Sequence, residues 1–101
     1  MSIQTVLDPT SDLIEQAKRV LPGGSFGNMP AEVVLKEGKG GRIWDEAGRE
    51  YVDYLLGSGP MLVGHAHPEV VEAIQPQATQ GTTFFANNEH GIRLAAEVAD
   101  A

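Results

Sequence analysis

The 101-residue sequence has room for one small domain, and its 42% hydrophobic and 21% charged residues are typical of an ordinary soluble globular protein. Fourteen acidic residues outnumber seven basic ones, and the basic ones are scattered, which argues against binding to a nucleic-acid backbone. The absence of cysteine excludes disulfides and thiolate metal sites. Neither an export signal nor an apolar run of roughly 18–20 residues is visible, so we expect a cytoplasmic protein without membrane contact.

The first expected element is a helix that begins near residue 10. Capping residue types occupy positions 8–11, and a helical spacing of apolar residues follows at Leu13, Ile14, Ala17, Val20 and Leu21. The Pro-Gly-Gly run at residues 22–24 cannot continue a helix, so we expect the helix to end there.

Three short strands are expected next, at residues 33–36, 42–45 and 50–55. Turn-forming residues separate them at positions 38–41 and 46–49. Strands this short with such short connections predict an antiparallel meander. With one helix as cover, this is near the minimum for independent stability.

Two further helices are expected in the second half of the chain. The first has His67 near its cap and Pro68 at its first position, and Pro76 predicts a kink or an early end. Residues 81–86 read as extended or irregular. A last helix begins near Asn88, and its apolar side is formed by Ile92, Leu94, Ala95, Val98 and Ala99. Because that apolar pattern stops at Ala101 without a capping residue, we expect this chain to be part of a longer polypeptide.

The histidines are the first candidates for chemistry. His65 and His67 stand two positions apart on a loop, whereas a catalytic zinc site takes three protein ligands. We therefore favour structural roles, with His67 capping the helix and His65 hydrogen-bonding locally. Metal binding through these imidazoles is the minor alternative.

Four carboxylates lie along the second and third strands and their turn. An acid–base pair would need two of them facing one cleft. We favour the alternative that they form a solvated face or pair with Arg42 and Arg49; the carboxylates concerned are Asp45, Glu46, Glu50 and Asp53.

Two loops could line a pocket. Gly57, Ser58 and Gly59 follow an apolar strand end and could form either a tight turn or a pocket edge. The segment Thr82, Thr83, Phe84 and Phe85 is either core packing or a pocket wall. No serine or lysine stands in a context typical of an activated nucleophile, so no catalytic residue is predicted.

Several motifs in order resemble one enzyme family. The string GKGGRIWDEAGREYVDY at residues 38–54 is similar to the K-G-x-x-[IL]-[WY]-D-x-x-G-x-x-Y-[IL]-D motif of class III (fold type I) aminotransferases. The similarity continues through residues 59–60, GHAHPEVVEAI at 64–74 and GTTF at 81–84. The LPGG run at residues 21–24 is similar to the glutamate-1-semialdehyde aminomutase branch.

The resemblance implies an α+β segment in which residues 1–56 form the N-terminal helix and meander of a small domain. Residues 57–101 would then be a pocket-edge loop and helices leading into an α/β large domain. It also implies a pyridoxal-phosphate enzyme, a homodimer with small-molecule amino donors and acceptors. Gly57, Ser58 and Gly59 would border the substrate pocket, and residues 82–85 would approach the active site near the subunit boundary.

This sequence departs from the family in ways that limit the expectation. The lysine that carries pyridoxal phosphate in the family is not in this chain, so the segment alone is not expected to be catalytic. Residues 25–30 contain no basic residue where the aminomutase branch has an arginine, and Ser58 replaces its pocket tryptophan. A related amine or amino-acid transaminase is therefore favoured. The alternative is a free-standing, non-catalytic interaction module with the same fold.

Overall fold

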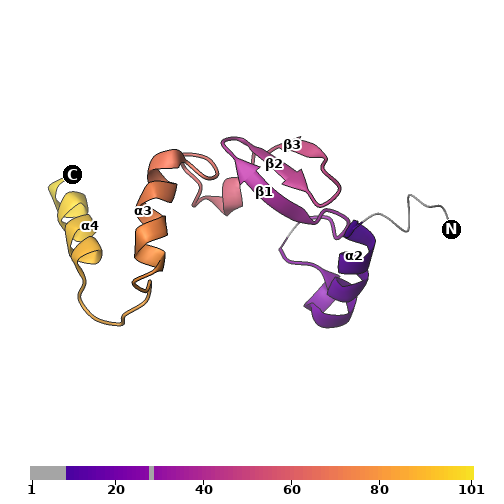
Figure 1. Ribbon diagram of the computed structural model, residues 1–101, viewed down its shortest axis with the longest axis horizontal. Helices are drawn as coiled ribbons and strands as arrows, with labels where there is room; N and C mark the ends of the chain where they lie inside the picture. Colours follow the sequence, from indigo (N-terminus) through magenta and orange to yellow (C-terminus); the bar gives the residue numbers. More distant parts are fainter. Residues whose placement is uncertain (1–8, 28) are drawn as a thin grey trace. The chain divides into compact units, whose positions relative to one another are not determined.

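The computed structural model describes residues 9–27 and 29–101, which divide into two compact units, residues 1–67 and 68–101. Among the described residues, the first unit holds one α-helix, two short helical turns and one sheet, and the second holds two α-helices, so the predicted α+β order of elements is confirmed (Figure 1). The assignment of residues 1–56 and 57–101 to the domains of a larger enzyme stays a prediction.

The first helix, α2 (Pro9–Val20), has Asp12 in its first turn and Lys18 and Arg19 in its last, as the helix dipole favours. It gives way to the short helical turn η1 (Pro22–Gly24), in which Gly23 has a φ of 72°. That left-handed conformation suits glycine and ends the helix where Pro22 predicts.

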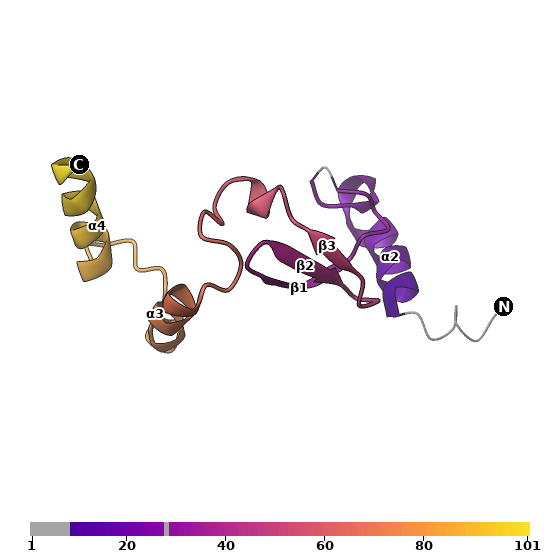
Figure 2. The same ribbon diagram turned by 90° about the horizontal axis from the view of Figure 1, so that it is seen from above.

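The sheet has the strand order β1-β2-β3, with β1 (Leu35–Lys39), β2 (Arg42–Asp45) and β3 (Glu50–Val52) all antiparallel. Figure 2 shows these strands beside α2 within the first unit. The predicted meander is therefore confirmed, and β2 has the predicted bounds. The other two strands differ from the prediction.

The first strand was expected at residues 33–36 with a turn at 38–41, and this placement is wrong by a few residues. Lys39 pairs with Arg42, so the turn is confined to Gly40 and Gly41, and Gly40 takes the positive φ of 58° that the turn requires. Gly38 remains in the strand because it pairs with Ile43. The His65 ring lies against it, and a Cβ atom on Gly38 would lie 2.6 Å from His65 Cγ, so the position requires glycine.

The third strand was expected to reach residue 55 but ends at Val52. The reason is Asp53, whose Oδ1 atom accepts hydrogen bonds from the backbone N–H groups of Leu55 and Leu56, each at 2.9 Å. These bonds turn the chain away from the strand direction, as side chains of this type do at turns.

Among the described residues, Ile43 is the one buried hydrophobic residue, at 8% exposure. It lies on the central strand β2, opposite Gly38 and Tyr51. A groove of about 450 Å³ in the same unit, between α2 and the residues before β1, is lined by apolar side chains that include Leu13, Phe26 and Val34. The first unit therefore has a small core and much apolar surface.

In the second unit, α3 (Pro68–Ala78) begins at the predicted proline and continues through Pro76. The helix thus ends two residues after Pro76 rather than at it, close to the expected early end, and the alternative of a kink at Pro76 stays a prediction. A proline lacks only the N–H that would bond four residues back, and the helix ends shortly afterwards in single-turn bonds. These are Thr79 N–H to Pro76 O at 3.2 Å and Gln80 N–H to Gln77 O at 3.0 Å.

The last helix, α4 (Glu89–Asp100), begins as predicted. Asn88 is its N-cap, and Asn88 Oδ1 accepts a 2.8 Å hydrogen bond from Gly91 N–H. Its apolar residues Ile92, Leu94 and Val98 are between 57% and 68% exposed.

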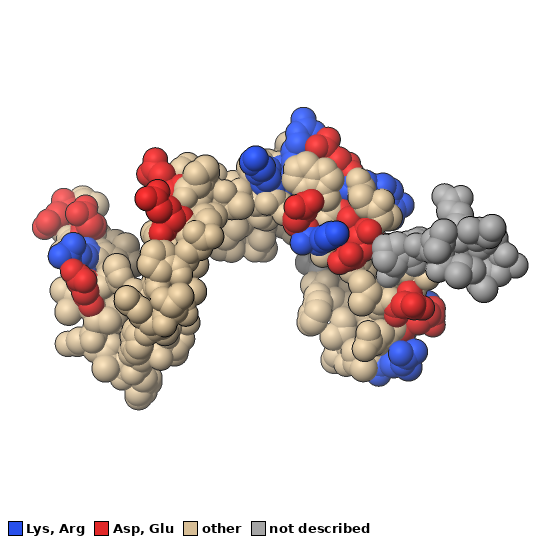
Figure 3. All heavy atoms as spheres, viewed as in Figure 1, with Lys and Arg blue, Asp and Glu red and all other residues tan. Residues whose placement is uncertain are grey.

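In the described part of the chain, no helix is both long and apolar enough to cross a bilayer. On the face in Figure 3, acidic and basic side chains are interspersed around the sheet.

Candidate functional site

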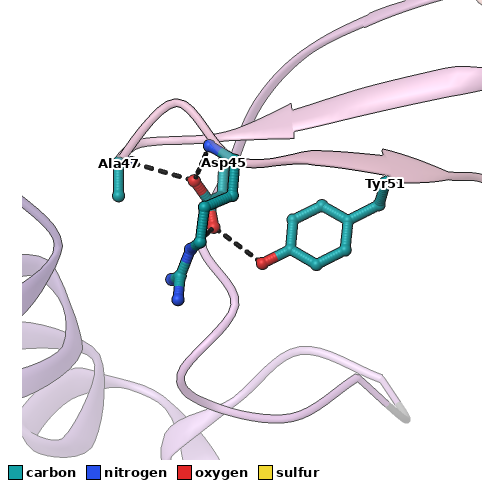
Figure 4. A network of polar contacts seen from close by, with 4 residues as sticks. Asp45, Ala47 and Tyr51 are labelled. Carbon is teal, nitrogen blue, oxygen red and sulfur yellow. Dashed lines mark hydrogen bonds and ion pairs between the residues drawn. The ribbon is translucent and has the colours of Figure 1, made fainter.

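A polar cluster closes the turn between β2 and β3, with Asp45 at its centre. The Asp45 side chain is buried, and its Oδ1 accepts hydrogen bonds from the backbone N–H groups of Ala47 at 3.0 Å and Arg49 at 2.9 Å. Its Oδ2 accepts from Arg49 Nε at 2.7 Å and from the Tyr51 hydroxyl at 2.8 Å (Figure 4). Both carboxylate oxygens are thus fully used within the turn, which indicates a structural role.

The same contacts perturb the pKa values of the two acids in this cluster. Burial raises the pKa of Asp45, but hydrogen bonds from Arg49 and Tyr51 and the Arg49 charge outweigh it, so the pKa lies below its ordinary value. The hydrogen bond to Asp45 raises the pKa of the Tyr51 hydroxyl, and burial adds to the effect. The Asp45 carboxylate is therefore held ionised as an acceptor, and is not poised to exchange protons.

The carboxylates otherwise form ion pairs as expected. Arg49 pairs with Asp45, and Arg42 Nη1 lies 3.2 Å from Glu50 Oε2 across the β2–β3 pair. The Arg42 and Glu50 side chains are 55% and 48% exposed, so solvent screens this second pair. The interpretation of these carboxylates as pairing partners is supported for Asp45 and Glu50.

The loop after β3 contains the predicted pocket-edge residues, and its backbone is left-handed over four consecutive residues. The φ angles are 50° at Leu56, 69° at Gly57, 67° at Ser58 and 120° at Gly59. We call residues 56–59 the left-handed turn; its first three residues form η2 (Leu56–Ser58). Such angles cost a non-glycine residue about 1–2 kcal/mol. Glycine types at positions 57 and 59 fit the turn, whereas Leu56 and Ser58 must be held in it.

A second polar pair lies at the base of this loop. His65 Nε2 donates a hydrogen bond to Asp53 Oδ2 at 2.5 Å. Asp53 Oδ1 accepts from the backbone N–H of Leu56, the first residue of the left-handed turn, and from that of Leu55 just before it. The hydrogen bond from His65, followed by that from the Leu56 N–H, lowers the pKa of Asp53. His65 was expected to hydrogen-bond locally; it does form a hydrogen bond within the fold, but the expectation of a local partner is wrong, because Asp53 is twelve positions away.

The second predicted segment lies in the other unit, and only part of it lines a pocket. Thr82 and Phe84 line a cleft of about 490 Å³ together with Ile74, Asn88 and residues near them. Thr83 and Phe85 are not part of this lining, and Phe85 is fully exposed with a φ of 51°. The structure therefore gathers Gly57, Ser58 and Gly59 in one turn, and Thr82 and Phe84 in one cleft.

The lysines do not fit a site for pyridoxal phosphate within this chain. Lys18 is 58% exposed and lies 3.1 Å from Glu15, and Lys36 and Lys39 are exposed on β1. None of them lines either of the two described pockets. In the described ranges, no group of three or more His, Asp or Glu side chains is placed to hold a metal ion.

The Asp53–His65 pair was not predicted from the sequence. The two residues lie at opposite ends of a loop, and no local spacing rule connects them. The clue lay in the glycines: Gly38 leaves room for the His65 ring, and Gly64, with a φ of 85°, lets the chain approach Gly40. His65 and Gly40 then exchange two backbone hydrogen bonds of 2.9 Å.

Comparison with known proteins identifies the family that this chain matches. Residues 25–100 match the family Aminotransferase class-III. Glutamate-1-semialdehyde 2,1-aminomutase of Persephonella marina is 39% identical over 102 residues, covering 94% of this chain and 24% of the relative. The chain thus spans about a quarter of the length of that relative.

Solved structures agree with the sequence match. An omega-transaminase from Sphaerobacter thermophilus superposes with a TM-score of 0.75 at 33% identity, covering 92% of this chain and 22% of that one. A transaminase solved with PLP bound superposes with a TM-score of 0.75 at 32% identity, covering 95% of this chain and 23% of that one. The chain belongs to the class-III aminotransferase family, whose N-terminal segment it matches.

Proposed function

We propose that this chain is the N-terminal part of a pyridoxal-phosphate-dependent aminotransferase. The complete enzyme transfers an amino group between an amine or amino acid and a keto or aldehyde acceptor. The observation that carries this proposal is the family match over residues 25–100, together with a fold shared over 92% of the chain with a transaminase four to five times its length. In this proposal the chain supplies scaffold and pocket edge, and further polypeptide supplies the catalytic lysine.

Exposed apolar surface supports the proposal that more protein packs against this segment. In the part of the chain that the structure describes, Ile43 alone forms the buried hydrophobic core. Ile74 on α3 and Ile92 and Val98 on α4 are each more than half exposed. So many exposed large apolar side chains are typical of a segment that packs against further protein. We assign that contact to the rest of the enzyme and to the second subunit of a homodimer.

The cofactor would be held by residues outside this segment, since none of its three lysines lies in a suitable pocket. Bound pyridoxal phosphate supplies the electron sink for amino-group transfer, and the protein supplies orientation and electrostatics. The residues of this chain would contribute the walls. The left-handed turn, with Gly57, Ser58 and Gly59, would border the substrate pocket, and residues 82–85 would approach it.

Two features of the sequence favour a transaminase over an aminomutase, the enzyme that the Persephonella marina relative is named as. Ser58, in the left-handed turn, stands where that branch has a pocket tryptophan. Residues 25–30 contain no cation for a substrate carboxylate, and the Ser25 hydroxyl is directed to the backbone, donating to Met29 O at 3.2 Å. The proposed substrate is therefore an amine or amino acid other than glutamate-1-semialdehyde.

A chimera tests this function. The matched segment of the Sphaerobacter thermophilus omega-transaminase would be replaced by this chain, and cofactor content and transamination would be measured. The control is the same enzyme with the segment deleted. We expect the chimera to bind pyridoxal phosphate and transaminate, and the deletion to do neither. A chimera that folds as stably as the parent but lacks transamination would contradict the proposal and favour an interaction module.

A further inference from the structure

The loop from Asp53 to His65 is closed at its base by backbone hydrogen bonds to the β1–β2 turn. At its start, Asp53 N–H donates to Gly41 O at 2.8 Å. At its end, His65 and Gly40 exchange backbone hydrogen bonds of 2.9 Å in each direction. Two residues far apart in the sequence are thereby brought together on the same hairpin, as in compact surface loops whose ends meet.

One carboxylate connects this closure to the left-handed turn. Asp53 Oδ2 accepts from His65 Nε2, and Asp53 Oδ1 accepts the backbone N–H groups of Leu55 and Leu56. Leu56 is the first residue of the left-handed turn, and it has a positive φ although it is not a glycine. The Asp53 side chain is only 9% exposed, so water cannot easily replace these donors. The His65 ring in turn is fixed by its packing against Gly38.

We propose that Asp53 and His65 form a positioning pair that holds the left-handed turn in place. His65 orients the Asp53 carboxylate, and the carboxylate then directs the two backbone N–H groups that start the turn. The turn continues with Ser58 N–H donating to Leu55 O at 3.0 Å. The role of this turn as a pocket edge rests on the proposed function, but the positioning itself does not.

The test is an NMR comparison of the full chain with two variants of His65. His65→Phe keeps a ring against Gly38 and removes the Nε2 donor. His65→Gln places an amide N–H at about the position of Nε2, so it can restore the hydrogen bond. His90→Gln, in the other unit, is the control. Positive φ at Ser58 gives a strong intraresidue cross-relaxation signal between the amide and α protons, and amide exchange reports the hydrogen bonds of residues 55 and 56.

We expect His65→Phe to raise amide exchange at residues 55 and 56 roughly tenfold or more and to weaken the Ser58 signal. The Ile43 amide should keep its protection, and His65→Gln should restore most of the turn. Unchanged exchange in His65→Phe would overturn the proposal. An equal loss of amide protection at Ile43 in His65→Phe and His65→Gln would overturn it too, because the pair would then act on the whole sheet. Absence of the Ser58 signal in the unaltered chain would overturn it as well. None of these outcomes depends on transaminase activity.

Discussion

The hydroxyl of Tyr51 donates a 2.8 Å hydrogen bond to the buried carboxylate of Asp45, across the turn that joins β2 to β3. The carboxylate also accepts from Arg49 and from the backbone of that turn. With Ile43 as the only buried hydrophobic residue among those described, polar contacts contribute much of the organisation of this sheet. Its stability should therefore respond to changes in hydrogen bonding that a larger core would tolerate.

Replacing Tyr51 by phenylalanine tests the first of these contacts. The buried Asp45 carboxylate would lose one of its donors while the ring remains, so we expect a lower denaturation midpoint. Asp45→Asn should cost more, because its amide would face the Arg49 guanidinium and the Tyr51 hydroxyl as a donor. The fluorescence of Trp44, on β2, can follow urea denaturation. Tyr54→Phe is the matched control, since Tyr54 is 94% exposed; an equal effect there would contradict the assignment.

The lowered pKa of Asp45 predicts acid sensitivity. Because the pKa in the folded chain lies below its unfolded value of about 4, the carboxylate adds stability above that value. That contribution is lost as the pH falls through the lower, folded pKa, and Asp53 acts with the same sign. We expect the urea midpoint, followed by Trp44 fluorescence, to decline below about pH 4.

Asp45→Asn supplies the control for this pH dependence. The variant removes one of the two lowered carboxyl groups, so its midpoint should be lower near neutral pH but should fall less on acidification. If the unaltered chain and the variant declined in parallel between pH 6 and pH 3, Asp45 would not be a source of the acid sensitivity.

The sequence predicts the elements well where a local rule decides them. Pro68 begins a helix and Asn88 caps one, as predicted, since each needs only its own backbone geometry. The prediction fails where a distant group decides. β3 ends at Val52 because Asp53 binds amides ahead of it. Gly38 is a strand residue rather than part of the turn because it pairs with Ile43, and it must be glycine because the ring of residue 65 lies on it.

The candidate site shows the same division. Glycines at positions 57 and 59 predict a tight turn, and the turn is present. The left-handed conformation of Leu56 and Ser58 could not be predicted, because neither residue type prefers it. It depends on Asp53, which is itself oriented by a histidine at the other end of the loop.

Asn88→Ala tests the start of α4. Asn88 Oδ1 accepts from Gly91 N–H at 2.8 Å, one of the amides that a helix leaves without an intrahelical partner. We expect its removal to destabilise the helix by about 1 kcal/mol. The α-carbon chemical shifts of residues 89–100 would report the change. Asn87→Ala, one position before the cap, should leave these shifts nearly unaltered; similar losses in both variants would show that Asn88 is not the cap.

Ser58→Gly should stabilise the first unit. At a φ of 67°, a serine costs about 1–2 kcal/mol relative to its preferred conformations, whereas glycine adopts this angle without steric cost. Glycine also has more conformational freedom in the unfolded chain, and this entropy offsets roughly 0.5–1 kcal/mol of the stabilisation. The expected net effect is a stabilisation of roughly 0.5–1 kcal/mol, measured as a higher urea midpoint of Trp44 fluorescence.

Ser25→Gly is the matched control for this last change. Ser25 has an extended φ of −155°, and its hydroxyl donates to Phe26 O at 3.3 Å and to Met29 O at 3.2 Å. Glycine at this position gains nothing in backbone strain and loses both hydrogen bonds, so the midpoint should fall. Opposite signs at the two serines would show that Ser58 is held in a strained conformation. A fall in both would mean that the left-handed turn carries no strain at Ser58.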